Sequence, residues 1–111
     1  MKTTYKLGEI IEFKGCFQIN GLISTAKLNI QEGDKAIVTR TGFRVLTGEA
    51  RGKRISFNRD EQVKGCDYSN ISKLIFNRIN GVFGLETYLY DEGIDYDEFM
   101  EEIQDVLMSI L

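Results

Sequence analysis

The chain has 111 residues, of which 42% are hydrophobic and 28% are charged, and its formal net charge is −3. This composition excludes an intrinsically disordered chain, which would combine fewer apolar residues with a larger net charge. The absence of histidine excludes Ser-His and Cys-His nucleophile pairs and histidine-ligated metal sites. The length predicts a single domain over residues 1–111, with a β-rich part at 1–63 and a helical, acidic part at 64–111.

The first 60 residues carry the alternation of apolar and polar side chains that predicts short β-strands. Ile11 and Phe13, for example, share one face of the first of these strands. The dipeptide Asn20-Gly21 between apolar neighbours predicts a tight hairpin turn, because a type I′ turn needs two residues with positive φ. The predicted strands cover residues 8–13, 16–19, 22–23, 26–30, 35–40, 43–45 and 55–57.

Turns separate these strands at residues 31–34 and 41–42, and a polar loop bounded by glycines is expected at 47–52. Short strands at regular spacing predict a small curved antiparallel sheet or barrel. Residues 32–38, followed by Gly42, resemble the turns of SH3-like barrels. This short resemblance implies an architecture and carries no function.

In the second half of the chain the apolar spacing changes to that of a helix. A helix is predicted over residues 68–80, with Asp67 or Ser69 as its N-cap and Asn80-Gly81 as its stop, followed by a short strand. The alternative is a hairpin around Asn80-Gly81 with a strand on either side.

The last segment, residues 95–111, has the clearest helical pattern. Asp95 and Glu98 predict a capping box at its start. The fold class is therefore predicted to be α+β: a small curved antiparallel β-sheet or SH3-like barrel followed by two C-terminal helices. The apolar stripe of the last helix, which must dock on the sheet or on a second subunit, consists of Phe99, Met100, Ile103, Val106, Leu107 and Ile110.

Charge is distributed unevenly along the chain. Residues 1–78 hold every Lys and Arg and carry a net +6, whereas residues 79–111 carry −9. Basic residues around the 48–52 loop, with Phe43 and Phe57 beside them, form a candidate site for phosphates and stacked bases. The alternative is that they solubilise exposed strands. These basic residues are Arg40, Arg44, Arg51, Lys53, Arg54 and Arg59.

Acidic residues are concentrated at the front of the last helix. Carboxylates in a first helical turn complement the helix dipole, but like charges spaced four residues apart destabilise a helix. This cost indicates that something compensates the negative charge, either the basic strands of the same chain, a basic partner protein or a cation, with a merely solvated face as the alternative. The candidate partner-binding residues are Asp91, Glu92, Asp95, Asp97, Glu98, Glu101 and Glu102.

No metal or other cofactor is expected. Residues 91–99 resemble the second half of an EF-hand loop, but a twelve-residue loop counted from Asp91 places Tyr96 where glycine is required. Residues 48–54 are one residue short of a phosphate loop and lack its Ser or Thr. Together with the lack of histidine, these observations predict that the protein is not an enzyme.

The leading hypothesis is a non-enzymatic protein that binds a partner protein through its acidic C-terminal surface and modulates or inhibits it. One alternative is a protein that binds nucleic acid or another anionic ligand through the basic residues. The other is a structural homo-oligomer with the apolar C-terminus at its interface. Size and composition are similar to those of accessory proteins of low-GC bacteria and their phages, which include inhibitors of defence proteins.

The sequence also predicts a cytoplasmic location without membrane association. The N-terminal residues MKTTYKLGEIIEF contain no signal-peptide-like apolar stretch, and no run approaches the roughly 20 apolar residues of a membrane helix. Thiols stay reduced in the cytoplasm. Cys16 and Cys66 are accordingly expected to be small, buried, unreactive side chains.

Overall fold

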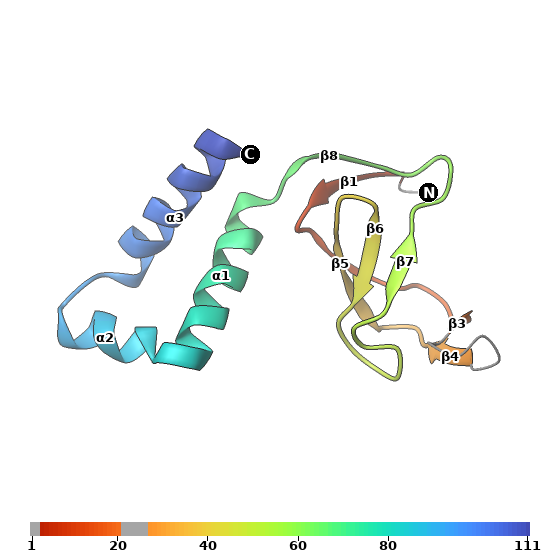
Figure 1. The fold of residues 1–111 in the computed structure, drawn as a ribbon, viewed down its shortest axis with the longest axis horizontal. Helices are drawn as coiled ribbons and strands as arrows, with labels where there is room; N and C mark the ends of the chain where they lie inside the picture. Colours follow the sequence, from red (N-terminus) through yellow and green to blue (C-terminus); the bar gives the residue numbers. More distant parts are fainter. Residues whose placement is uncertain (1–2, 21–26) are drawn as a thin grey trace. The chain divides into compact units, whose positions relative to one another are not determined.

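The chain folds into a β-rich unit and a helical unit. The computed structural model describes residues 3–20 and 27–111 (Figure 1). Unit 1 comprises Met1–Cys66 and unit 2 comprises Asp67–Leu111. Strands occupy the first and helices the second, which confirms the α+β fold class with a small sheet.

Within the described residues, unit 1 contains eight short strands. They pair into a four-stranded antiparallel sheet of order β2-β5-β6-β7, an antiparallel pair β3–β4 and a parallel pair β1–β8. This pairing does not show closure into a barrel. The strands are β1 Thr4–Leu7, β2 Ile10–Glu12, β3 Phe17–Asn20, β4 Lys27–Ile30, β5 Lys35–Val38, β6 Gly42–Val45, β7 Arg54–Ser56 and β8 Gln62–Cys66.

The four-stranded sheet places most of its apolar residues on one face, as the alternation predicts, whereas Ile10 and Ile37 lie on the face of Arg44. Val38 lies opposite Phe43, which in turn lies opposite Ile55. The Phe43 ring packs edge-to-face on Tyr5 and on Phe57, with centroids 5.1 and 5.0 Å away. These contacts form the larger of the two cores of unit 1.

The hairpin predicted at Asn20-Gly21 is described only in part. Asn20 is still within β3 and lies opposite Lys27 of β4. Gly21 and the strand predicted at 22–23 lie outside the described residues. The turn predicted at 31–34 is confirmed, since the Asp34 N–H donates to the Gln31 carbonyl at 3.0 Å and Gly33 has a φ of 94°.

The first helix of unit 2, α1 (Tyr68–Phe83), begins as predicted and ends later. Asp67 caps it, because the side chain of Asp67 accepts a hydrogen bond from the Asn70 N–H at 3.0 Å. The predicted stop at Asn80-Gly81 is wrong: the helix continues to Phe83 and ends at Gly84, whose φ is 66°. A glycine in this left-handed conformation is a common helix terminator.

A short strand is predicted after α1, and the structure corrects this to a helix, α2 (Leu85–Asp91). Asn80 provides the physical reason, since its side-chain Oδ1 accepts a hydrogen bond from the Glu86 N–H at 2.8 Å. This bond satisfies one of the N–H groups that a helix start leaves without a partner.

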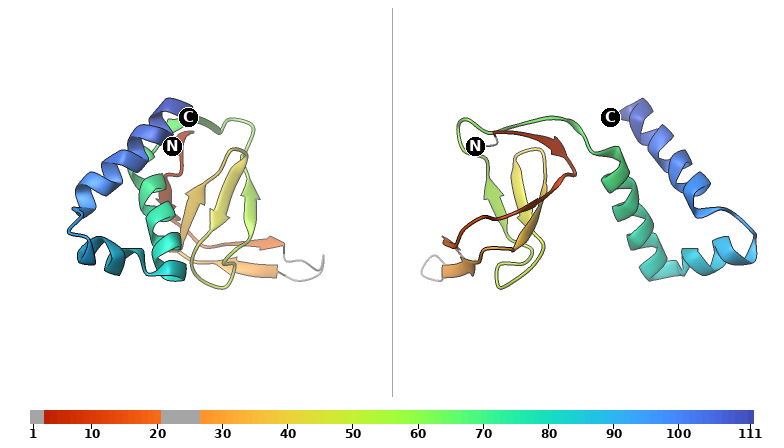
Figure 2. Two further views of the ribbon diagram at one scale, coloured as in Figure 1. Left: turned by 60° about the vertical axis from the view of Figure 1, so that its left-hand side comes forward. Right: turned by 180° about the vertical axis from the view of Figure 1, so that it is seen from behind.

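The last helix, α3 (Tyr96–Ile110), occupies the predicted segment and runs beside α1, with α2 joining them at one end (Figure 2). Asp95 is its N-cap residue, but the Asp95 side chain makes no capping hydrogen bond, so the predicted capping box is wrong. Among the described residues no helix is long and apolar enough to cross a membrane.

The core of unit 2 is small. Only Phe76, Leu89 and Met100 are buried apolar residues there. The Phe76 ring packs edge-to-face on Tyr96 and on Phe99, with centroids 5.0 and 6.0 Å away. The predicted apolar stripe of α3 is therefore covered from Phe99 to Ile103, whereas Val106 and Ile110 are exposed.

The cysteines differ from the prediction of buried side chains. Both thiols are free, Cys16 is exposed and Cys66 is partly exposed. Cys16 directly precedes β3 of the two-stranded pair, and Cys66 is the last residue of β8. Each lies at a strand end, where short strands of a small unit offer little cover.

Candidate functional site

The seven predicted partner-binding carboxylates lie in one segment of unit 2, and all are exposed. In the described part of the chain none of them forms an ion pair. Unit 2 holds ten acidic residues against two basic ones, Lys73 and Arg78, both on α1. The unit itself therefore leaves its negative charge uncompensated.

Helix formation explains only part of this acidic segment. Asp97 and Glu98 lie in the first turn of α3, where the helix dipole favours negative charge. Glu101 and Glu102 lie beyond that turn and are each four residues from another carboxylate. Such like-charge pairs cost about 0.2–0.5 kcal/mol each. Glu101 and Glu102 therefore lower the stability of the helix instead of supporting it.

An apolar hollow of about 330 Å³ lies between α1 and α3. Ile75 contributes from α1, and apolar residues spaced along α3 from Phe99 to Leu107 contribute from the other side. Glu102 stands at its edge. The volume is at the lower end of the range of roughly 300–1,000 Å³ for ligand pockets. The lining residues are Ile75, Phe99, Glu102, Ile103, Val106 and Leu107.

A second hollow continues the first along α3. Phe99 and Glu102 line both, and the second adds Ile94, Glu98 and Glu101. The two together form one surface, here named the α3 groove, with an apolar floor and glutamates along its edge. From Phe99 to Leu107 the floor extends about 12 Å, at about 1.5 Å per residue.

The structure divides the predicted acidic residues into groups. Glu98, Glu101 and Glu102 line the α3 groove. Asp97, again with Glu101, lines a more polar hollow that also contains Lys73 of α1. The remaining three, which line none of these hollows, are Asp91, Glu92 and Asp95.

Unit 2 also exposes most of the large apolar side chains. Of the fourteen exposed large hydrophobic residues in the described part of the chain, twelve belong to unit 2. Phe83 is 81% exposed and Tyr90 is 85% exposed. The sequence analysis assigned the apolar stripe of the last helix to the sheet or to a second subunit, but it assigned no binding role to Phe83 or Tyr90 because it expected a short strand after the first helix.

Ile75 and Ile94 of the α3 groove are further residues that the sequence prediction did not assign to a site. Ile75 belongs to the apolar stripe that predicts α1, and this stripe does not reveal which of its members stay accessible. Ile94 precedes α3 as an isolated apolar residue among acidic ones. That isolated position was the signal by which it could have been found.

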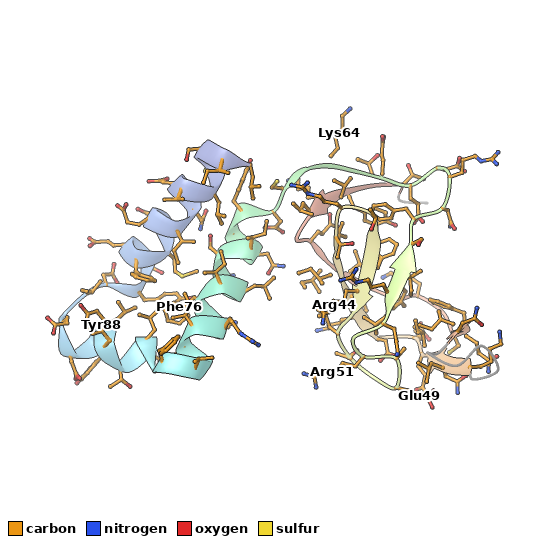
Figure 3. All side chains as sticks on the ribbon, in the orientation of Figure 1. Arg44, Glu49, Arg51, Lys64, Phe76 and Tyr88 are labelled. Carbon is orange, nitrogen blue, oxygen red and sulfur yellow. The ribbon has the colours of Figure 1, made fainter. Side chains whose placement is uncertain are left out.

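Two of the predicted basic residues are brought together by the four-stranded sheet. Arg44 of β6 lies directly opposite Arg54 of β7, and Ile37 lies on the other side of Arg44. Both arginines are exposed, and neither forms an ion pair in the described part of the chain. Figure 3 labels Arg44 and Arg51, which come from β6 and from the loop that follows it.

The other basic residues are spread along the β6–β7 pair. Arg51 and Lys53 lie in the loop that joins these strands. The prediction that Arg40 and Arg59 also lie beside this loop is wrong. Arg40 precedes β6 and Arg59 follows β7, and the Phe57 N–H donating to the Thr41 carbonyl shows that these two ends meet away from the loop.

Base stacking by Phe43 and Phe57 is not supported by their positions. Phe43 is buried, and Phe57 packs on both Tyr5 and Phe43. Their rings are used in the core because they lie on the inner face of the sheet. Phe43 and Phe57 therefore do not offer the exposed rings on which the bases of single-stranded nucleic acid stack.

The 48–52 loop packs against the rest of unit 1. Glu49 accepts a hydrogen bond from the Asn29 N–H at 2.6 Å, and Ala50 is fully buried between Ile30 and Val45. The loop lies where the sequence predicts it, but its polar composition does not indicate that the Ala50 side chain is buried.

The pKa of Tyr5 is raised, first by burial and then by its hydrogen bond to Glu61, and this pair belongs to the core of unit 1. Among the residues that the structure describes, no three His, Cys, Asp or Glu side chains gather as a metal site.

Comparisons with known proteins add no assignment. No protein-family model, no curated protein and no solved structure matches the chain.

Proposed function

We propose that the protein is a non-enzymatic binding protein that contacts a partner protein through unit 2 and thereby modulates or inhibits it. One observation carries this proposal: exposed carboxylates without ion pairs and most of the exposed apolar side chains occur in the same 45-residue unit. We place this function in the cytoplasm, whose reducing conditions fit two free thiols.

The exposed apolar side chains supply the driving force for binding. Soluble proteins rarely expose large apolar patches, and those that they do expose mark interaction sites. Aromatic residues are enriched among the side chains that dominate binding energy. Phe83, Tyr88 and Tyr90 are such residues, and Figure 3 shows Tyr88 on α2.

The carboxylates contribute selectivity among partners and a higher rate of association. Charges at the rim of an interface steer association and exclude partners of like charge more than they add affinity. Glu98, Glu101 and Glu102 border the apolar floor of the α3 groove. The surface therefore favours a partner whose own apolar patch is surrounded by positive charge.

The test is a charge reversal in the full chain, E98K with E102K. A matched control, E32K with D60K, makes the same change in net charge with exposed carboxylates of unit 1. Partners captured from the native host after nuclease treatment are identified by mass spectrometry, and their affinity is then measured by calorimetry.

We expect the unit 2 variant to lose the partner and the unit 1 variant to retain it. The thermal unfolding midpoint of the unit 2 variant should stay close to that of the original chain, because one like-charge pair replaces another while Glu101 and Asp105, each three residues further on, become opposite-charge neighbours. Equal affinity of both variants for the partner would refute the proposed function.

A second candidate function is the binding of nucleic acid or another polyanion by unit 1, favoured by the opposed pair Arg44 and Arg54. Under this proposal, R44Q with R54Q weakens binding of an oligonucleotide and lowers its salt dependence, because fewer counterions are released. K14Q with K64Q is the matched control, since both lysines are exposed and distant in sequence from this pair.

A further inference from the structure

We infer that the α3 groove receives an amphipathic helix of the partner protein, with apolar side chains on its docking face and Lys or Arg residues flanking them. This inference rests on the proposed function and names the chemistry of the partner at that site. Helix-in-groove recognition uses anchors at i, i+3, i+4 and i+7, which span two turns.

The dimensions of the groove fit such an occupant. Its floor extends about 12 Å from Phe99 to Leu107, which is slightly more than two turns of a helix. One wall is Ile75 of α1, so the floor is bounded by two helices of the same unit. A helix of the partner protein that packs against both would cover Val106, whose side chain is 56% exposed in this structure.

Charge complementarity selects a basic helix. Glu98 and Glu102 lie one turn apart along the groove edge, and no Lys or Arg follows Arg78 in the sequence. An acidic or neutral helix would bury the apolar floor but leave these carboxylates partly desolvated without a partner, which is unfavourable. Flanking Lys or Arg residues would supply that partner.

The same charges disfavour a second copy of this chain as the occupant. A two-fold interface places the same patch of both subunits face to face. Pairing two α3 grooves would therefore bring the glutamates of one copy toward those of the other. Like-charge juxtaposition of this kind costs free energy across an interface.

The experiment titrates the full chain with a panel of fluorescently labelled 16-residue peptides, read by fluorescence anisotropy. Each peptide carries Leu, Ile or Phe anchors at helical spacing, flanked by Lys or Arg. One control set keeps the composition and scrambles the anchor positions. A second control set replaces each Lys or Arg by Glu.

Two groove variants are compared with matched variants on the same helix. V106D introduces a charge into the floor, and M108D makes the same change at an exposed apolar residue that does not line the groove. E102K reverses the charge at the edge, and D105K does so at an exposed carboxylate outside the groove. Circular dichroism verifies that all four fold.

We expect patterned basic peptides to bind at micromolar concentration and both control sets to bind at least tenfold more weakly. V106D should weaken binding by about tenfold or more, corresponding to about 1.4 kcal/mol. E102K should weaken it about threefold to tenfold at low salt and less at high salt, since rim charges are screened. M108D and D105K should change it less than twofold.

Several results would overturn the inference. They are failure of the whole panel to bind, equal binding of scrambled peptides, or unchanged binding by V106D. A dimer of the chain that V106D dissociates would assign the groove to a second copy. Cross-links in the monomer between Glu102 and lysines of unit 1 would assign the groove to the chain itself.

The native partner separates this inference from the proposed function. If E98K with E102K abolishes capture of that partner while V106D leaves it intact, the partner uses the carboxylates without the groove, and only the inference fails. If neither variant affects capture, the proposed function fails with it.

Discussion

Arg44 and Arg54 lie directly opposite each other on neighbouring strands of the four-stranded sheet, and both are exposed. Like charges at opposed positions destabilise a pair of strands, because the side chains are held about 5 Å apart. No carboxylate in the described part of the chain relieves this pair by an ion pair. The sheet therefore keeps two positive charges together at a cost in stability.

Replacing one of these arginines should stabilise unit 1. We expect R54T to raise the free energy of unfolding by about 0.2–1 kcal/mol, because it removes the repulsion and places a β-branched residue in a strand. R51T in the neighbouring loop is the control and should have almost no effect. Urea unfolding measures both, and a lower stability of R54T would contradict the interpretation.

Two glycines should respond in opposite directions to alanine. A Cβ on Gly42 would lie 2.0 Å from the Ile55 carbonyl oxygen of the neighbouring strand, whereas a Cβ on Gly81 would meet nothing within 4 Å. We expect G42A to destabilise unit 1 by about 3 kcal/mol or more, as overpacking against backbone does. G81A, inside α1, should stabilise unit 2 by about 0.5–1 kcal/mol. Thermal unfolding, monitored by circular dichroism, measures whether each variant is less or more stable than the original chain.

The bond from the Glu86 N–H to Asn80 should be measurable as a loss of helix stability. We expect N80A to cost about 0.5–2 kcal/mol, the range for removing a helix cap. N77A is its control: Asn77 lies exposed on the same helix, and alanine there should raise stability by a few tenths of a kcal/mol. Equal effects of the two changes would show that the Asn80 bond does not support α2.

Tyr5 should make unit 1 sensitive to alkaline conditions. Its pKa is raised by burial and by the hydrogen bond that its hydroxyl donates to Glu61 at 3.2 Å, so folding favours the neutral phenol. The corresponding stability is complete below the unfolded pKa of about 10 and is lost as the pH rises through the higher folded value.

Y5F keeps the ring and removes the titrating group. At pH 7 this variant should be less stable by about 1 kcal/mol, the typical net value of a hydrogen bond. Between pH 9 and 12 it should lose less stability than the original chain. The measurement is chemical unfolding across this pH range, and parallel losses in the two proteins would exclude Tyr5 as the cause.

Local features were predicted well from the sequence. The cap at Asp67 depends on a side chain and an N–H three residues away, and it was found as expected. The strand alternation that buries Val38 and Phe43 is likewise a property of adjacent residues. The helix of residues 95–111 was recognised from its apolar spacing, although its capping box was not formed.

Features that depend on partners outside the predicted element were predicted poorly. Asn80-Gly81 resembles a helix stop in isolation, yet Gly84 supplies the left-handed residue and Asn80 bonds to Glu86 instead. Parallel pairing of β1 with β8 joins segments about 58 residues apart, as in the register of Thr4 with Gln62, and no short pattern encodes it. The prediction that both cysteines are buried was wrong, because the burial of a side chain depends on residues from other elements.

The sequence by itself determined the α+β class, the separation of positive from negative charge, and the absence of the histidine chemistry that many enzymes use. These properties depend on composition and on residues close together in the chain. Only the tertiary structure decided that Arg44 faces Arg54, that Phe43 is buried, and that Glu102 borders an apolar groove with Ile75. Each of these is a contact between separate elements, and packing selects among the many faces that a periodic pattern leaves equivalent.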